Sequence, residues 1–444
     1  MRRFCWLLAL TLLLGMLPGC GGTGSVTVYD AEGNRLATVS QMDFSPQELT
    51  DLGYDDYVCL VLTEAVSALT EQRGLTESRA RRLLFSGGWE IHTAFVPAVY
   101  AALEAAYATA PEGLAFGGAV TDLQGALCAV YSGGGTANGI TPRSPHSSIK
   151  PLSVYGPAMD AGLIHWGTRL TDEPYTQTVG EGGRLTSWPS NATDSYSYQP
   201  ERLVDCIRQS LNTTAVKCLS EYGVSRSVAF LESRLGIDLT AEKERMQAAD
   251  EDEIIGNIAL GSLVAGVSPV DMAGYYQIFA NYGMYQRPHT VTAIRRADGE
   301  ALYTYSGEAQ QVIQPTTARI MNHLLQTVVQ HGGTGADAFS EEVEVAGKTG
   351  TGDRFEDNWF LGVTPEYSCA IWHGEGLQQN RAAELFAQVL KHLPAHTQTI
   401  FPDCERVHKG YFCKETGLLF TQSCSKVEVG YYASTQPPAV CNGH

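Results

Sequence analysis

The sequence predicts an α/β fold of the α+β type, in which a mixed, mainly antiparallel sheet is flanked by helices. Two strand-like runs lie early, at residues 114–120 and 126–132, and the turn between them predicts a hairpin. Three further strand-like runs follow late in the chain, at residues 343–351, 358–363 and 367–372. Segments with helical periodicity fill the interval between the two groups. Strands separated in this way by helices indicate a mixed domain of helices and sheet.

The remaining elements are predicted from local patterns. Residues 26–39 hold two β-rich runs around a Gly-Asn turn, which predicts a short hairpin. Residues 45–84 turn helical after the capped start Ser45-Pro46-Gln47-Glu48. Further helices are predicted at residues 97–109, 147–163, 200–210, 214–235, 271–282, 315–331 and 380–393. Residues 165–200 are polar and irregular, and a long loop of this kind inside a folded domain favours a functional role.

The composition excludes several classes of protein. Of 444 residues, 44% are hydrophobic and 18% are charged, as in an ordinary globular chain. The net charge of -18 argues against nucleic acid, because such binding depends on Lys and Arg neutralising phosphates. The chain has no basic stripe and no GxGxxG turn, so we expect no nucleic acid and no cofactor.

The first twenty residues predict an export signal. Arg2 and Arg3 precede an apolar run that is too short to span a hydrocarbon core of about 30 Å. A cysteine directly after such a run is similar to the lipobox of bacterial lipoproteins, so we expect Cys20 to be lipidated and to anchor the protein to the membrane. Pro18 departs from that pattern, which keeps an uncleaved anchor or an ordinary signal as alternatives.

Four of the eleven cysteines crowd the C-terminal segment: Cys404, Cys413, Cys424 and Cys441. In an oxidising compartment this segment is expected to hold two disulfides, with three pairings open. A zinc site is the alternative, although the spacings are wide and no Cys-x-x-Cys occurs. Five others have apolar neighbours and are expected in the core: Cys59, Cys128, Cys206, Cys218 and Cys369.

Three short motifs for nucleophilic chemistry occur in order along the chain. They are Ser147-Ser148-Ile149-Lys150, Ser210-Leu211-Asn212 and Lys348-Thr349-Gly350. A second S-x-x-K, which begins at Ser423, has no such companions and is interpreted as chance. Three ordered motifs are far harder to obtain by accident than one.

Each motif has a physical rationale. The Ser147 hydroxyl needs a base to remove its proton, and a helix that begins at Ser147 would place the Lys150 amine one turn on. A lysine acts as a base only when its pKa is lowered, which burial or a second cation such as Lys348 would do. The two amines would then exchange protons through the Ser210 hydroxyl. Gly350 removes a side chain where the backbone must approach the substrate.

These motifs resemble the signature of serine β-lactamases and penicillin-binding proteins. Their surroundings are similar to the transpeptidase region of class A penicillin-binding proteins, from about residue 87 to residue 444. The segments that carry the resemblance are 145–151, 188–191, 210–216, 260–261, 266–269, 279–283, 333–335, 346–351 and 358–365. It implies the transpeptidase-like fold, with a helical subregion that carries the S-x-N motif.

The resemblance also implies roles. Ser147 would attack the penultimate D-Ala carbonyl of a peptidoglycan stem peptide, with Lys150 as base and with Ser210 and Lys348 as a proton relay. The N–H groups of Ser147 and Thr351 would form the oxyanion hole. The substrate-binding residues would be Asn212, Thr349, Gly350 and Thr351. β-Lactams would acylate Ser147, and no metal is expected in the reaction.

Two residues depart from the family's pattern, and the domain organisation differs as well. His146 stands where the family usually has Gly, and Gly352 stands where a hydroxylated residue is common. The hairpin at 26–39 runs directly into helices, which leaves no room for a glycosyltransferase domain and predicts a transpeptidase-only relative. The expected division is an export signal at 1–20, a hairpin and helical linker at 21–86, a transpeptidase domain at 87–395 and a Cys-rich tail at 396–444.

The preferred function is therefore a D,D-transpeptidase on the outer face of the bacterial cytoplasmic membrane. Its expected partners are stem peptides, β-lactams and a separate glycan polymerase. A D,D-carboxypeptidase or a serine β-lactamase that uses water as acceptor is the first alternative. A non-catalytic β-lactam sensor or cell-wall scaffold is the second.

Overall fold

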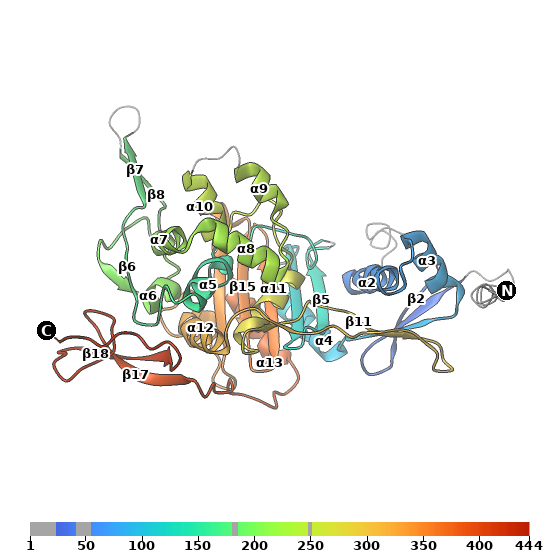
Figure 1. Ribbon diagram of the computed structural model, residues 1–444. Helices are drawn as coiled ribbons and strands as arrows, with labels where there is room; N and C mark the ends of the chain where they lie inside the picture. The colour runs from blue at the N-terminus through green and yellow to red at the C-terminus, as the bar shows by residue number, and fades with distance from the viewer. Residues whose placement is uncertain (1–23, 41–54, 136, 180–184, 247–250, 444) are drawn as a thin grey trace, which may run out of the picture.

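The computed structural model describes residues 24–40, 55–135, 137–179, 185–246 and 251–443. Its centre is a five-stranded sheet in the order β14-β15-β16-β4-β5, with every neighbouring pair antiparallel (Figure 1). The strands are β4 (Phe116–Asp122), β5 (Leu127–Gly133), β14 (Ala346–Thr351), β15 (Asn358–Val363) and β16 (Tyr367–His373). All five lie where the sequence predicts strands.

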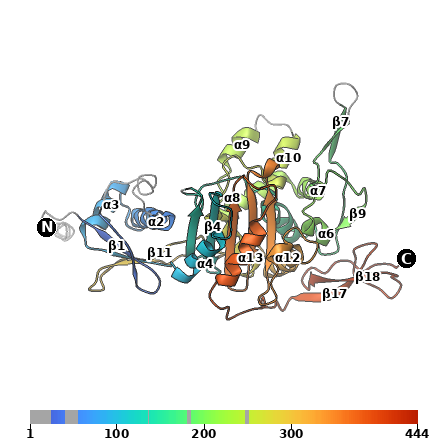
Figure 2. The same ribbon diagram turned by 180° about the vertical axis from the view of Figure 1, so that it is seen from behind.

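Both faces of the central sheet are buried, and alternate residues of its strands pack on opposite sides. Phe360 and Ile371 join one hydrophobic cluster, and Leu361 and Ala370 join the other. Helices α4 (Pro97–Tyr107) and α13 (Ala382–His392) cover the first face, as the reverse view in Figure 2 shows. Helices α11 (Pro269–Tyr276) and α12 (Pro315–Val328) lie on the other side. The sheet is thus a rigid support for the residues at its open edge, β14.

The middle of the chain forms the helical region. Its helices are α5 (Gly156–Asp160), α6 (Leu203–Arg208), α7 (Asn212–Tyr222), α8 (Val224–Leu235), α9 (Thr240–Met246) and α10 (Glu251–Leu260). The helix predicted at 147–163 is instead a 3₁₀ turn at His146–Ile149, a wider π turn at Pro151–Tyr155 and then α5. Pro151 and Pro157 lack backbone donors, which accounts for the irregularity. The helix predicted at 214–235 is two helices, because Gly223 adopts a φ of 101° between them.

A second sheet has the order β12-β11-β3-β1-β2 and lies at the N-terminal end of the molecule in Figure 1. Its strands are β1 (Val26–Tyr29), β2 (Arg35–Val39), β3 (Glu90–Thr93), β11 (Val291–Arg295) and β12 (Ala301–Thr304). β1 and β2 form the predicted hairpin, and α2 (Asp56–Arg73) and α3 (Glu77–Ser86) replace the single helical stretch predicted there. The predicted helix start at 45–48 lies outside the described residues. Because β3 and β11 belong to this sheet, it is formed by three separate parts of the chain. The predicted domain boundary between residues 86 and 87 stays a prediction.

Short ribbons complete the fold. Two of them lie in or at the end of the polar segment 165–200. In one, β6 (Arg169–Thr171) pairs with β9 (Pro200–Arg202). The other is the projecting hairpin of β7 (Thr176–Val179) and β8 (Leu185–Trp188). β10 (Met284–Tyr285) pairs with β13 (Gln310–Gln311). In the tail, β17 (Val407–Cys413) pairs with β18 (Val427–Ala433) at the opposite end from the N-terminal sheet. Within the ranges described, no helix has the length and apolarity needed to cross a membrane.

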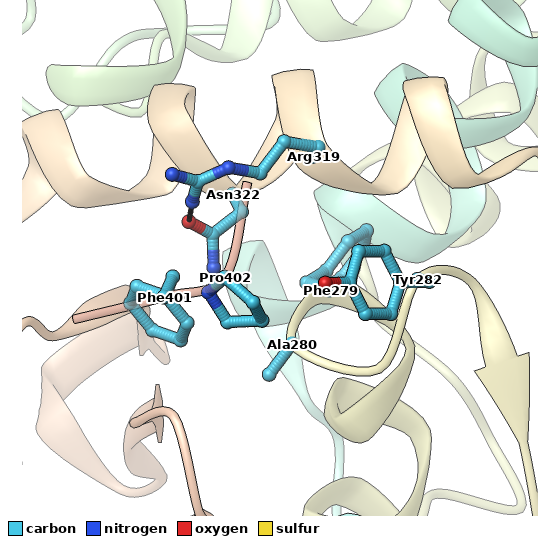
Figure 3. A pocket seen from close by; sticks show the side chains of 7 residues that line it. All are labelled: Phe279, Ala280, Tyr282, Arg319, Asn322, Phe401 and Pro402. Carbon is cyan, nitrogen blue, oxygen red and sulfur yellow. Dashed lines mark hydrogen bonds between the residues drawn. The ribbon is translucent and has the colours of Figure 1, made fainter. Parts of the chain in front are cut away.

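The connection into the tail crosses α12 over a small cavity of about 10 Å³ (Figure 3). Phe401 and Pro402 close one side, and Arg319 donates a hydrogen bond of 2.9 Å to Asn322 on the helix beneath. A cavity of this size holds about one water molecule. It is too small for a substrate, so the active site must be sought elsewhere.

Candidate active site

The segment that carries Ser147 is fixed from several directions. Ser147 lies half-buried in the turn His146–Ile149, and its carbonyl accepts the backbone N–H of Lys150. The Tyr276 hydroxyl of α11 donates to the Ser148 carbonyl, and the Trp359 indole of β15 donates to the Ser144 carbonyl at 2.9 Å. These contacts tie the turn to the sheet and to the helical region, which preorganises the serine.

Strand β14 passes directly beside this turn. A Cβ atom on Gly350 would lie 2.4 Å from the Pro145 carbonyl oxygen and 3.1 Å from the Ser148 nitrogen. Only glycine allows the two backbones to approach so closely. The structure therefore gives Gly350 a role in packing against the turn at Ser147, while its role in approaching a substrate stays a prediction.

Lys150 is fully buried at the junction between the turn and α7. Its Nζ donates to the carbonyl oxygens of Ser210 and Leu211, at 2.9 and 3.2 Å, and to Asn212 Oδ1 at 2.7 Å. All three acceptors are uncharged. Burial in the first place, and the charge of Lys348 in the second, lower the pKa of Lys150 well below its ordinary value. The lowered pKa favours the neutral amine, which can accept a proton once one of these three hydrogen bonds opens.

Lys348 approaches the same group from β14. Its Nζ donates to Ser210 Oγ at 2.7 Å and to the Thr349 carbonyl at 3.0 Å. Burial lowers the pKa of Lys348 to about 7. Ser210 has a φ of 58°, a costly conformation for a residue with a side chain, and it lies between the two lysines. The structure thus brings together Lys150, Ser210, Asn212 and Lys348, with Ser147 one turn before Lys150.

The two threonines of β14 have different surroundings. Thr349 is nearly buried, and its hydroxyl donates to Thr334 Oγ1 at 2.8 Å. Thr351 is exposed, and its hydroxyl accepts a hydrogen bond of 2.9 Å from Asn380. Asn380 also donates to the Gly350 carbonyl at 2.8 Å, so it fixes the end of the strand. No sequence pattern marks Asn380, because a single Asn before a helix is usually a cap.

Asp172 is a positioning residue that the sequence patterns did not identify. Its carboxylate accepts hydrogen bonds from Asn191 at 2.7 Å, from the Thr213 hydroxyl at 2.6 Å and from the Ser197 N–H at 2.8 Å. Burial raises its pKa, but these hydrogen bonds outweigh burial and leave the pKa lowered. Asn191 in turn accepts the backbone N–H of Asn212 at 2.9 Å. The buried carboxylate therefore fixes the start of α7 and, through it, Asn212.

The family model described as "Penicillin binding protein transpeptidase domain" matches residues 136–391, which is more than half of the chain. The chain belongs to the penicillin-binding protein transpeptidase family. This confirms the resemblance found in the motifs.

Curated members of the penicillin-binding protein family match over different lengths. Penicillin-binding protein 1A of Clostridium acetobutylicum is 33% identical over 257 residues, which are 56% of this chain and 30% of that protein. Penicillin-binding protein 1F of Bacillus subtilis is 28% identical over 384 residues, which are 82% of this chain and 48% of that protein. The chain therefore spans about a third to about half the length of these relatives.

Solved structures of penicillin-binding proteins share the fold. The D,D-transpeptidase domain of a peptidoglycan glycosyltransferase from Eggerthella lenta has a TM-score of 0.61 at 20% identity, covering 84% of this chain and 98% of that one. Penicillin-binding protein 1A from Haemophilus influenzae has a TM-score of 0.66 at 14% identity, covering 94% and 98%. Similarity at this level of identity shows the fold, and the predicted α+β architecture is confirmed.

The two departures from the penicillin-binding protein pattern lie in contact with each other. His146 adopts a φ of 48°, which a glycine would take at little cost. Gly352 is buried, and a Cβ atom there would lie 2.7 Å from Nε2 of His146 and 2.8 Å from Oε1 of the exposed Glu356. The imidazole thus fills the space that a hydroxylated residue at 352 would need.

This contact gives a prediction about the pair. Gly352→Ser is expected to lower the free energy of unfolding by about 1 to 3 kcal/mol, because the new side chain collides with the imidazole. The same substitution in a His146→Gly background should cost about 1 kcal/mol less, because the imidazole is gone and only the exposed Glu356 side chain has to move. Urea denaturation of the wild type, both single variants and the double variant measures the interaction energy. Strictly additive effects would contradict the assigned contact.

Proposed function

We propose that the protein is a peptidoglycan D,D-transpeptidase that works through an acyl-enzyme on Ser147. The observation that carries the proposal is the pair of fully buried lysines, Lys150 and Lys348, that meet at Ser210. Two buried amines without a carboxylate partner among their hydrogen-bond acceptors are costly for stability, and such a cost is typical of a catalytic site. Membership of the transpeptidase family supports the same reaction class.

In the proposed first step, Lys150 Nζ removes the proton from Ser147 Oγ, which attacks the penultimate D-Ala carbonyl of a stem peptide. The N–H groups of Ser147 and Thr351 stabilise the oxyanion. The amide bond then breaks, and the terminal D-Ala leaves with a proton delivered through Lys348 and Ser210. In the second step the amine of a neighbouring stem attacks the ester and gives up a proton to Lys150. The ester bond breaks, Ser147 Oγ takes that proton back, and the new amide is the cross-link.

Substrate binding is proposed for Asn212 and for the end of β14, where Thr351 is exposed. The Asn212 amide already contacts Lys150 Nζ at 2.7 Å and the Ser190 carbonyl at 2.7 Å, and each end of the amide has one further hydrogen-bonding position. The Thr349 and Thr351 hydroxyls would hold the substrate carboxylate, and Gly350 would allow the backbone to approach. β-Lactams would enter the same place as mimics of the D-Ala-D-Ala bond.

The proposed reaction implies where in the cell the protein acts. Peptidoglycan is assembled outside the cytoplasmic membrane, so we propose export through residues 1–20, lipidation at Cys20 and action on the outer face of that membrane. The glycan strands would come from a separate glycan polymerase. In this proposal, residues 87–395 carry the reaction and 396–444 form the tail.

The test separates transpeptidation from its alternatives. The purified protein is mixed first with a fluorescent penicillin, and then with a D-Ala-D-Ala donor peptide in the presence and absence of an acceptor amine. A long-lived penicillin adduct and an amine-dependent cross-linked product are expected. Release of D-Ala alone, whatever the amine concentration, would identify a carboxypeptidase. Rapid turnover of the penicillin would identify a β-lactamase, and the absence of an adduct would overturn the proposal.

A further inference from the structure

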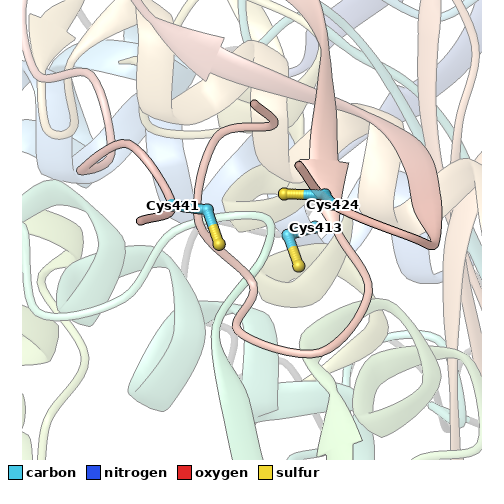
Figure 4. Close-up of side chains that lie close together, drawn as sticks. All are labelled: Cys413, Cys424 and Cys441. Carbon is cyan, nitrogen blue, oxygen red and sulfur yellow. The ribbon is translucent and has the colours of Figure 1, made fainter. Parts of the chain in front are cut away.

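Three cysteines of the tail converge on one point. The Sγ atoms of Cys413, Cys424 and Cys441 all lie within 4.8 Å of one another (Figure 4). Cys413 and Cys441 are buried, and Cys424 is half-buried. Cys404, the fourth cysteine of the tail, does not belong to this group.

The fold of the tail creates this convergence from segments that are distant in sequence. Cys413 ends β17, Cys424 lies in the turn before β18, and Cys441 follows β18. The Leu419 N–H donates to the Ala439 carbonyl at 2.9 Å, and the Cys441 N–H donates to the Leu419 carbonyl at 2.8 Å. The Cys413 N–H donates to the Leu418 carbonyl at 2.8 Å. Backbone pairing therefore holds all three sulfur atoms in place.

The spacing of the sulfur atoms favours a shared ion over disulfides. A disulfide joins two sulfur atoms at about 2.05 Å and uses only two of the three thiols that converge here. A tetrahedral zinc ion with Zn–S bonds of about 2.3 Å places its sulfur ligands about 3.8 Å apart. Three mutual separations within 4.8 Å are close to that arrangement, and a small inward movement of each side chain would complete it.

The surroundings of the sulfur atoms suit thiolates. The Thr416 hydroxyl donates to Cys441 Sγ at 3.4 Å, and the Thr421 N–H donates to Cys424 Sγ at 3.4 Å. Donors of this kind orient metal-binding sulfur and favour its charged form.

We propose that Cys413, Cys424 and Cys441 bind one zinc ion as thiolates, and that this ion holds the tail in its folded form. Binding releases the protons of the thiols to solvent. The fourth position is open to water or to another side chain. His444 follows Cys441 at a Cys-x-x-His spacing and lies outside the described residues, so the three thiolates carry the proposal. Of the two sequence expectations for the tail, the zinc alternative is therefore preferred to two disulfides.

The experiment measures metal in the full chain, purified without chelators. Elemental analysis is expected to find about one zinc per chain in the wild type and in Cys404→Ser, the matched control from the same tail. Loss of zinc is expected in Cys413→Ser, Cys424→Ser and Cys441→Ser. Metal-free protein whose intact mass shows a disulfide within the group would overturn the proposal, as would loss of zinc in Cys404→Ser.

A second measurement covers the case in which the serine variants do not fold. Wild-type protein is loaded with cobalt in place of zinc, and its absorption spectrum is recorded. Charge-transfer bands from sulfur to cobalt are expected, and their absence would overturn the proposal. Ser147→Ala should bind the metal as the wild type does, because the tail site is separate from the lysine pair. Failure of the zinc proposal is thereby distinguishable from failure of the proposed acyl transfer.

Discussion

Ser147→Ala is expected to abolish covalent labelling by fluorescent penicillin, with a loss on the order of 10⁶-fold in acylation rate. The substitution removes the nucleophilic oxygen. Because the Ser147 side chain is half-buried, little packing is lost with it. The free energy of unfolding should change by less than about 1 kcal/mol. Gel fluorescence after timed exposure to penicillin measures the loss, and mass spectrometry of the labelled peptide identifies the attacked residue.

The chain contains its own control for this experiment. Ser423 begins the second S-x-x-K, but the structure places it exposed on the tail, and Lys426 is exposed as well. Lys426 therefore lacks the burial that lowers the pKa of Lys150 and suits that amine to act as a base. Ser423→Ala should therefore label as the wild type does. Label that persists in Ser147→Ala, or that maps to the tail, would refute the assignment of the nucleophile.

Lys348→Met is expected to lower the rate of penicillin acylation by about 10² to 10⁴-fold, because the proton relay through Ser210 is lost. The same variant should be more stable than the wild type at pH 7, by about 1 to 3 kcal/mol, because a buried amine is replaced by an apolar side chain of similar length. Loss of activity together with a gain in stability would mark Lys348 as a residue retained for chemistry.

The pH dependence of this gain has a definite sign. Lys348 has a pKa of about 7 in the folded protein against an ordinary value of 10.5, so between these values the unfolded chain binds more protons. The stability of the wild type therefore rises with pH across that window, and the advantage of Lys348→Met shrinks. Urea denaturation at pH 7 and at pH 9.5 measures both effects. Lys243→Met, at an exposed lysine paired with Glu232, is the matched control. It should show neither the gain in stability at pH 7 nor the loss of that gain as the pH rises.

The sequence was most informative where chemistry or alternation constrains the residue types. The five central strands were predictable because one face of the sheet packs on α4 and α13 and the other on α11 and α12. The three motifs were predictable because their order and chemistry are distinctive. The structure adds what spacing could not supply, the meeting of Lys150 and Lys348 on either side of Ser210.

Other features depend on contacts that no local pattern records. β3 and β11 are short and pair across about 200 residues of chain, so neither has a strong strand signal of its own. Asp172 lies in a polar segment without periodicity, and only its burial beside Asn191 and Thr213 reveals its role. The helix predicted at 147–163 was wrong in form because Pro151 and Pro157 change the hydrogen-bonding pattern within it.

The contact between His146 and Gly352 also restricts the evolutionary history of the active site. A lineage that carries this histidine and gains a serine at 352 first passes through a destabilised intermediate, whereas one that first replaces the histidine does not. The accessible mutational path therefore has a direction, with position 146 changing before position 352. The two residues should be inherited together, so relatives with the histidine are expected to carry the glycine as well.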